Sequence, residues 1–471
     1  MSRINTNVSS LIAQRVLRRN NDSLNTSLER LSTGLKINSG KDNPAGLIAS
    51  ENLRAEKAGI SQAIDNAERA ANIIGTAEGG LSEISSLLTE VQTLVGQAAN
   101  SGGLSPEELE ANQLQVDSIL GTINRIAGSV AFQGTKLLNG NYAYSTSSVA
   151  TSAFDSLQIN AARTPDGAKV NVIVQVLNSA TIGKVSFTDA GGDIQSAVTL
   201  TVAGNLGTEQ LSFASGTNLS AIAAGINAIT EVTGVTASAN AGGNLSFSST
   251  GFGADAFVSV AADKAFFAVA GGTSGKDFGT DADVTVNGAV AQADGKAITY
   301  RTSNLDIEFD LSDGLNGGQS KTFAITGGGA TFALGSKVTE ADKASIGIQN
   351  VSTGSLGDGT IGTLSDLASG KDKSLESGNL VAAQRVLDKA IKQVSQLRGR
   401  LGAFQKFTIG STVNSLGVAF ENASAAESAI RDTDFAQETA NLTRSQILAQ
   451  AATTVLAQAN ASPQAALSLL R

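Results

Sequence analysis

The side chains that most often carry out chemistry in proteins are scarce in this chain of 471 residues. The sequence has no histidine and no cysteine, which removes the commonest general base, the thiolate nucleophile and the soft metal ligands. A serine–histidine–aspartate triad is therefore impossible, although a serine–lysine pair is still open. Gly327-Gly328-Gly329 lacks the Lys-Ser/Thr that completes a phosphate-binding loop, so we expect a turn there. We predict a protein that is not an enzyme and that has no cofactor.

Carboxylates offer the next candidate, a calcium site. Asp281 and Asp283, or the acids that alternate over residues 306–310, supply the oxygen ligands that Ca²⁺ prefers. They lack the spacing and the loop glycine of an EF-hand. Carboxylates that alternate along a strand more often face water, so we predict no metal site.

A basic cluster near the N-terminus could contact nucleic acid or an anionic membrane. Arg15, Arg18 and Arg19 form it, but a solvated helix face or ion pairs between subunits is the simpler interpretation. The net charge of −9 argues against nucleic acid as a partner. The chain has no run of 18 apolar residues and no signal-peptide core, so we predict neither membrane insertion nor a cleaved secretory signal.

Heptad repeats dominate the two ends of the chain. Residues 44–99 are predicted to form one long helix, in which every seventh residue from Ile60 to Val95 is apolar and no proline follows Pro44. At 1.5 Å per residue such a helix would be ~84 Å long, which predicts a rod rather than a compact globule. A second heptad stretch begins at residue 380, and its register slips near Phe407. The predicted rod-core seam consists of Ile60, Ile74, Leu81, Leu88, Leu387, Val394, Leu397, Leu401 and Phe404.

Narrower seams lie at the extreme ends, in residues 4–36 and in a helix that we expect Pro463 to end. Neither end can bury its seam alone, so they should pair with each other or with copies of themselves. Asn21 interrupts the N-terminal seam as a tolerated polar layer or as a register-fixing residue. The predicted packing residues are Leu17, Leu24, Leu28, Leu31, Leu35, Phe435, Leu442, Ala449, Leu456, Leu467 and Leu470.

The middle of the chain differs in composition from both ends. From about residue 141 to 360 it is rich in small and β-branched residues with strand-like alternation, and a short helix near residue 222 lies among these strands. We predict a mainly α fold with an inserted β-rich region: a discontinuous helical rod and coiled coil from both termini, with solvent-facing α+β outer domains. The expected domains are 1–41 with 432–471 (inner coiled coil), 42–175 with 342–431 (rod) and 176–341 (outer region).

Several short stretches at the two ends of the sequence form a family pattern: residues 3–7, 28–39, 41–42, 132–138, 430–436, 446–448, 455–460 and 468–471. In these stretches, and in their order, the chain closely resembles bacterial flagellin. The resemblance implies an extracellular structural subunit that self-assembles into the flagellar filament for swimming. It also implies a type III export apparatus, a secretion chaperone, a filament cap and hook–filament junction proteins as partners. A junction protein that shares both termini, and a secreted adhesin that uses the middle region, are the alternatives.

One departure from the family concerns recognition by animals. In flagellins that a Toll-like receptor senses, the family has a basic residue where this chain has Glu90, followed by a leucine that matches Leu94. A glutamate partner on the next helix matches Gln115. A reversed charge at an interface loses the contact and still costs desolvation, so we predict weak receptor activation. A reporter-cell titration checks this, and potency equal to that of a strongly sensed flagellin would contradict it.

Overall fold

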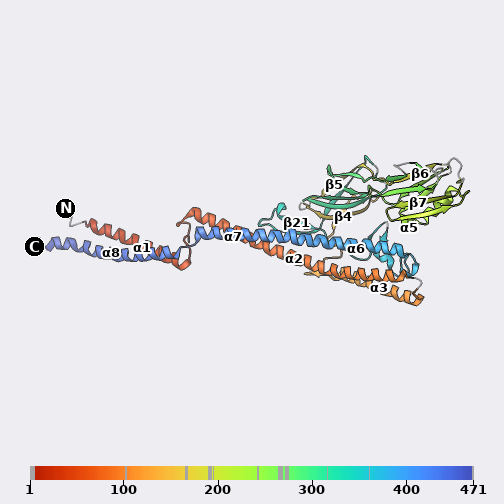
Figure 1. The fold of residues 1–471 in the computed structure, drawn as a ribbon. Helices are drawn as coiled ribbons and strands as arrows, with labels where there is room; N and C mark the ends of the chain where they lie inside the picture. Colours follow the sequence, from red (N-terminus) through yellow and green to blue (C-terminus); the bar gives the residue numbers. More distant parts are fainter. Residues whose placement is uncertain are drawn as a thin grey trace. The chain divides into compact units, whose positions relative to one another are not determined.

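The computed structural model divides into two compact units, and each is described by itself. Unit 1 contains Met1–Arg69, Ala333–Asp342 and Ile409–Arg471, and unit 2 contains Ala70–Phe332 and Lys343–Thr408. Each unit therefore combines early and late segments of the chain, which are red to orange and blue in Figure 1. The structure describes residues 6–100, 103–164, 168–188, 194, 196–240, 243–263, 269–270, 275–313, 315, 317–359 and 361–468.

Long helices occupy both ends of the described chain. They are α1 (Val8–Thr33), α2 (Pro44–Ala98), α3 (Pro106–Ser129), α6 (Leu380–Ala403), α7 (Ser411–Arg431) and α8 (Phe435–Ser468). Capping explains two of the starts. The side-chain oxygen of Asn43 accepts a hydrogen bond from the Gly46 N–H at 2.9 Å, and Ser105 forms a capping box with Glu108.

The expectation that Pro463 ends the last helix is wrong, because α8 continues to Ser468. A proline inside a helix removes one backbone N–H and leaves the carbonyl four residues earlier without its usual donor. That carbonyl belongs to Ala459, and it accepts a hydrogen bond from the side chain of Asn7 at 2.8 Å. A tertiary contact therefore replaces the lost helical one.

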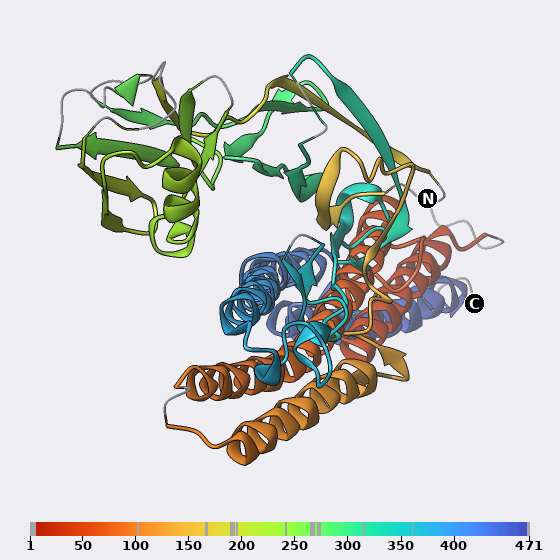
Figure 2. The same cartoon turned by 90° about the vertical axis from the view of Figure 1, so that its right-hand side faces the viewer.

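The residues predicted for the rod-core seam are buried, except Phe404. In α2 the buried side chains alternate at spacings of three and four residues from Ile60 to Ala98, which is the pattern of a coiled-coil seam. In α6 the predicted seam residues from Leu387 to Leu401 are no more than 2% exposed. Phe404 is half-buried, with its ring centroid 6.2 Å from that of Phe332. In unit 2, Figures 1 and 2 show α3 and α6 beside the second half of α2.

A π-helical segment explains the register slip near Phe407. This segment, η4 (Phe404–Gly410), lies between α6 and α7. A π-helix closes its hydrogen bonds one residue later than an α-helix does and so rotates the residues that follow. The heptad row of α6 ends at Phe404, and a new row begins with the buried Ile409.

The inserted region contains two β modules, each with its own hydrophobic core, and Figure 2 shows them as two lobes. In the first module the sheet orders are β15-β14-β5-β19-β3 and β16-β17-β18-β4. Phe154 packs edge-on against Phe309 and Phe323 in its core. Its strands are β3 (Tyr144–Ser147), β4 (Phe154–Ala162), β5 (Val170–Asn178), β14 (Asp283–Val286), β15 (Ala289–Val290), β16 (Gln292–Asp294), β17 (Ala297–Arg301), β18 (Leu305–Leu311) and β19 (Ser320–Gly328).

The second module contains the predicted strand–helix–strand–strand unit. Its sheets have the orders β12-β6-β10-β9 and β13-β11-β7-β8, and α4 buries Leu219, Ile222 and Ile226 in the core. Its elements are β6 (Lys184–Thr188), β7 (Val198–Gly204), β8 (Thr208–Phe213), α4 (Leu219–Asn227), α5 (Thr230–Thr233), β9 (Val235–Ala239), β10 (Asn244–Ser249), β11 (Phe257–Ala262), β12 (Val269–Ala270) and β13 (Lys276–Phe278).

Short strands and turns complete the fold. The strands pair as hairpins β1–β2, β20–β21 and β22–β23, and three 3₁₀ turns lie after residue 339. These elements are β1 (Ala131–Phe132), β2 (Thr135–Lys136), β20 (Ala330–Ala333), η1 (Glu340–Asp342), β21 (Lys343–Ile346), β22 (Gly357–Asp358), β23 (Gly362–Thr363), η2 (Leu364–Leu367) and η3 (Leu375–Ser377).

Asp281 lies where the chain passes from the second module back to the first. One of its carboxylate oxygens accepts hydrogen bonds from the N–H groups of Gly295 (2.8 Å) and Ala254 (2.9 Å). These backbone donors, that of Gly295 first, hold the pKa of Asp281 below its usual value. The carboxylate therefore ties loops of the two modules together. Asp283, two residues on, is exposed at the start of β14.

We expect Leu88→Ala to lower the free energy of unfolding by about 2–5 kcal/mol, because it opens a cavity at a fully buried seam position. Ile48→Ala is the matched control on the same helix. Ile48 is 65% exposed, so this change should cost less than about 0.5 kcal/mol. Denaturant unfolding of the monomer, followed by helical circular dichroism, measures both. Equal losses would show that α2 lacks a buried seam.

We expect Asp281→Ala to destabilise the β-rich region by about 1 kcal/mol at neutral pH, because two backbone donors lose an exposed charged acceptor. The pKa of Asp281 is lower in the folded state than in the unfolded state. Ionised Asp281 therefore stabilises the fold fully at a pH above its unfolded pKa, and this stabilisation is lost as the pH falls below about 4. Thermal unfolding of the wild type and the variant should therefore converge in acid. Asp283→Ala is the control, and an equal effect at both positions would refute the assignment.

Candidate assembly surface on the paired terminal helices

Helices α1 and α8 of unit 1 run antiparallel, side by side (Figure 1). The contacts that span the pair run from Asn7 with Ala459 to Arg30 with Glu438. Facing side chains on both helices are buried or half-buried at alternating spacings of three and four residues, which is knobs-into-holes periodicity. The seam residues are Ser10, Ala13, Leu17, Asn20, Leu24, Ser27 and Leu31 on α1, and Glu438, Leu442, Ser445, Ala449, Ala452, Leu456 and Ala459 on α8.

Most of the predicted packing residues lie on this seam, and three lie off it. Leu28 is 46% exposed, because the seam steps from Leu24 to Ser27 and then to Leu31, and Leu28 is one position further round the helix. Leu35 is half-buried after the end of α1, and Phe435 is exposed except where its ring reaches Gly34. Leu467 falls within α8, and Leu470 lies outside the described residues.

The seam also contains polar residues that the heptad count missed. Asn21, which the sequence places among the leucines, is exposed, whereas its neighbour Asn20 faces α8 and donates a hydrogen bond to the Leu448 carbonyl at 3.1 Å. Glu438 is only 6% exposed and lies 3.6 Å from the Arg30 guanidinium. A strict alternation of three and four residues, started at Ala13, would have identified Asn20.

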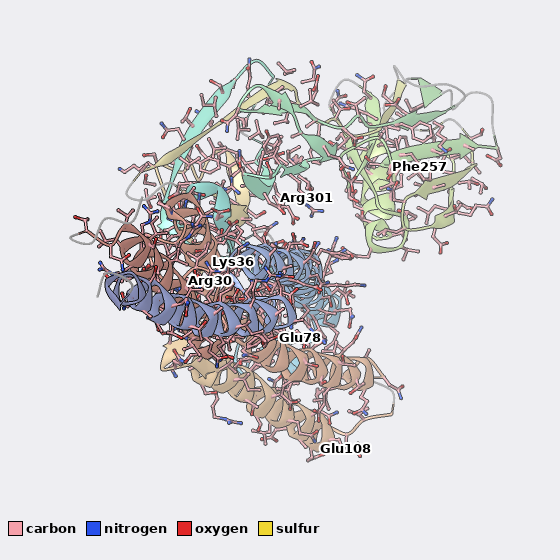
Figure 3. The ribbon with its side chains drawn as sticks, turned by 90° about the vertical axis from the view of Figure 1, so that its left-hand side faces the viewer. Arg30, Lys36, Glu78, Glu108, Phe257 and Arg301 are labelled. Carbon is pink, nitrogen blue, oxygen red and sulfur yellow. The ribbon has the colours of Figure 1, made fainter. Side chains whose placement is uncertain are left out.

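Backbone hydrogen bonds close the inner end of the pair. α1 ends at Gly34, whose φ of 73° lies in the left-handed region that glycine adopts without strain. The Lys36 N–H donates to the Arg431 carbonyl at 2.6 Å, and the Thr433 N–H donates to the Gly34 carbonyl at 2.9 Å. Figure 3 labels Arg30 and Lys36 in this region. The two chain segments therefore meet as a short antiparallel bridge where each passes into or out of the terminal pair.

Ion pairs connect α2 and α7 next to this bridge. Glu51 lies 3.0 Å from Arg431, and Lys57 lies 2.8 Å from Glu427. These pairs occupy the part of α2 that precedes its buried apolar row at Ile60. Partly exposed pairs contribute little stability each, so this part of unit 1 is held more weakly than the apolar seam.

The outward faces of the terminal helices carry large apolar side chains. They follow a helical spacing on α1, and on α8 they lie near the middle of the helix, where Ile447 and Leu448 are beside Arg444. Contiguous exposed apolar side chains on a protein mark interaction surfaces. Seven apolar residues on these faces are between 43% and 61% exposed: Val8, Leu11, Ile12, Val16, Ile447, Leu448 and Val455.

The three residues that the sequence predicts to correspond to a receptor-contacting stretch divide into two groups. Glu90 on α2 and Gln115 on α3 are exposed, whereas Leu94 is only 5% exposed. Leu94 is therefore part of the subunit's own core.

The acids of β18 are partners of basic and hydroxyl groups. Arg301, labelled in Figure 3, lies 2.6 Å from Glu308, and Asp310 accepts a hydrogen bond from Ser156 at 2.7 Å. Pairing with Glu308 raises the pKa of Arg301. Burial lowers the pKa of Arg400, and the negative charges of Glu308 and Asp306 oppose that shift.

The described residues hold no cluster of three or more acids arranged to bind a metal ion. Among the described helices, none has the length and hydropathy of a membrane span.

Comparisons with known proteins match both helical ends. The family model "Bacterial flagellin N-terminal helical region" matches residues 4–143, "Bacterial flagellin C-terminal helical region" matches 385–470, and "Flagellin hook IN motif" matches 199–251. The chain is 30% identical over 476 residues to Flagellin B of Vibrio anguillarum, and the match covers 99% of both proteins. It is also 30% identical over 534 residues to the Flagellin of Salmonella typhimurium strain LT2, again over 99% of both. A similar solved structure is FliC from Burkholderia pseudomallei, with a TM-score of 0.25 and 18% identity over 72% of this chain and 99% of that one.

Proposed function

We propose that the α1–α8 pair is the polymerising element of this chain, which belongs to the bacterial flagellin family and is an extracellular structural subunit of the flagellar filament. Relatives that match over nearly the whole chain are flagellins, so a junction protein and an adhesin are not favoured. The observation that carries the proposal is the set of exposed apolar side chains on the outward faces of α1 and α8.

The energetics of the pair support assembly through these faces. The seam between α1 and α8 is rich in serine and alanine, which bury little apolar area, and two isolated helices with such a seam are only marginally stable. Burial of one exposed valine, leucine or isoleucine is worth roughly 1.5–3 kcal/mol. Contact with neighbouring subunits therefore supplies stability that the monomer lacks, and the terminal helices become fully ordered in the filament.

The domain boundaries belong to the same proposal. We assign residues 1–41 with 432–471 to the inner coiled coil, 42–175 with 342–431 to the rod and 176–341 to the outer region. Two features support the first boundary: α1 ends at Gly34, and the bridge between Leu35 and Asp432 lies where α7 gives way to α8. Burial of the heptad rows of α2 and α6 supports their role as the rod-core seam.

The partners follow from the family and from the exposed terminal surface. We propose that the subunit leaves the cell through the flagellar type III export apparatus and is incorporated beneath a filament cap, beyond the junction proteins of the hook. A secretion chaperone would cover the apolar face of α8, including Ile447 and Leu448, before assembly. We propose that the work of the protein is mechanical, as the structural role of the flagellin family supports.

Seeded growth tests the polymerising element. Purified monomer is added to short filament fragments and followed by electron microscopy, beside a chain that lacks residues 1–35 and 436–471. We expect the full chain to grow and the truncated chain to remain monomeric. Growth of the truncated chain, or a full chain that never extends a seed, would contradict the proposal.

Point substitutions make the test more specific. Ile447→Ser with Leu448→Ser should slow growth by about tenfold or more, because each side chain would lose its burial in the filament. Val290→Ser on β15 is the matched control, since Val290 is 75% exposed but lies in the inserted β module. Unfolding of unit 2 should be unchanged in both variants, and equal growth rates would rule out this face of α8.

A further inference from the structure

The end of α8 contains a carbonyl that its own helix leaves without a donor. In an α-helix each carbonyl accepts a hydrogen bond from the N–H four residues later. The residue four positions after Ala459 is Pro463, which has no N–H. Pro463 is the one proline in the sequence of α8, so before the last turn this carbonyl differs chemically from the others of the helix.

Asn7 supplies the missing donor from the opposite end of the sequence. Its side-chain nitrogen donates to the Ala459 carbonyl at 2.8 Å, while its side-chain oxygen caps α1 by accepting from the Ser10 N–H at 3.1 Å. The cap fixes the direction of the amide, since the oxygen must face α1 and the nitrogen therefore faces α8. One side chain thus starts its own helix and recognises a single carbonyl of the other.

We propose that Asn7 and Pro463 form a register lock, in which the orphan carbonyl selects the position of α1 along α8. Half of the α8 seam discriminates poorly between registers. A shift of seven residues replaces Ser445 by Ala452 and Ala452 by Ala459, so in this row one small residue takes the place of another. In the other row the same shift exchanges leucine and alanine at Leu442, Ala449 and Leu456. The small-residue row alone would therefore tolerate a slip, whereas a polar contact within a seam specifies register.

The lock is the outermost of four polar contacts along the pair. The innermost is the backbone bridge between Leu35 and Asp432. Between them lie Asn20, which donates to the Leu448 carbonyl, and the ion pair of Arg30 with Glu438. No long stretch of the small-residue seam is therefore left without a polar contact. Asn7 and Asn20 are positioning residues: they keep the outward apolar faces of both helices in a fixed relation.

A double-mutant cycle on the full-length chain tests the coupling between Asn7 and Pro463. Asn7→Ser keeps a good N-cap but is too short to donate to Ala459. We expect it to weaken α1–α8 pairing in the wild-type background and to have almost no effect in the Pro463→Ala background, where α8 supplies its own donor. Hydrogen exchange of α1 amides in the monomer and in seeded filaments measures the pairing. If Asn7→Ser lowers the protection of α1 amides equally in both backgrounds, Asn7 acts only as a helix cap and the register lock is refuted.

Disulfide trapping reports the register directly, because the chain has no cysteine of its own. Ala13 lies between Asn7 and Asn20 on α1, as Ala452 lies between Ala459 and Leu448 on α8, and both alanines are buried. Ala13→Cys with Ala452→Cys should trap the native register. Ala13→Cys with Ser445→Cys or with Ala459→Cys should trap a slip of one heptad.

We expect Asn7→Ser to lower the ratio of native to slipped cross-links by roughly fivefold, the factor that corresponds to one net hydrogen bond. Pro463→Ala should lower the ratio of native to slipped cross-links by a similar factor and should also make α8 more helical. If Pro463 had only a structural role, a more helical α8 would not come with a lower ratio. An unchanged ratio in both variants would overturn the lock. The register lock itself does not depend on the proposed function; only its effect on filament growth does. Cross-linking in the monomer tests the register lock even if seeded growth shows that other surfaces polymerise.

Discussion

The structure depends on the pairing of its first long helix with its last. α1 and α8 are more than four hundred residues apart, yet each is the main partner of the other. A seam of serine, alanine and a few leucines gives neither helix enough buried area to be stable alone. The rest of the chain must therefore return to its starting point, which explains why both units are built from early and late segments and why the β-rich region is an insertion.

Within this arrangement, stability is distributed unevenly. The second half of α2 and the facing row of α6 bury continuous apolar seams. The first part of α2 faces α7 through ion pairs, and the terminal pair has a small-residue seam with polar contacts at intervals. Burial of apolar area contributes far more than partly exposed ion pairs do. A subunit of this kind keeps a firm helical core while its ends still have surface to bury against neighbours in the filament.

The inserted modules are stabilised in a different way. Each has its own aromatic and aliphatic core, and some charged groups outside these cores have local partners. Arg301 balances Glu308 on β17 and β18, and Asp281 is held by backbone donors between the modules. These carboxylates therefore link neighbouring strands and loops of the inserted region.

Heptad periodicity in the sequence by itself determined the long helices and the rows of buried side chains on α2 and α6, because apolar spacing dictates which face of a helix is buried. The change to strand-like alternation located the inserted β region. It also located the register slip that η4 accommodates. Tertiary structure decided which polar residues enter a seam. Asn20 rather than Asn21 faces α8, Leu28 is exposed, and α8 continues through Pro463. These outcomes depend on contacts between residues hundreds of positions apart, above all that of Asn7 with Ala459. Local propensity contains no information about such a contact, since a proline predicts a helix end until a distant side chain satisfies the carbonyl that it leaves free.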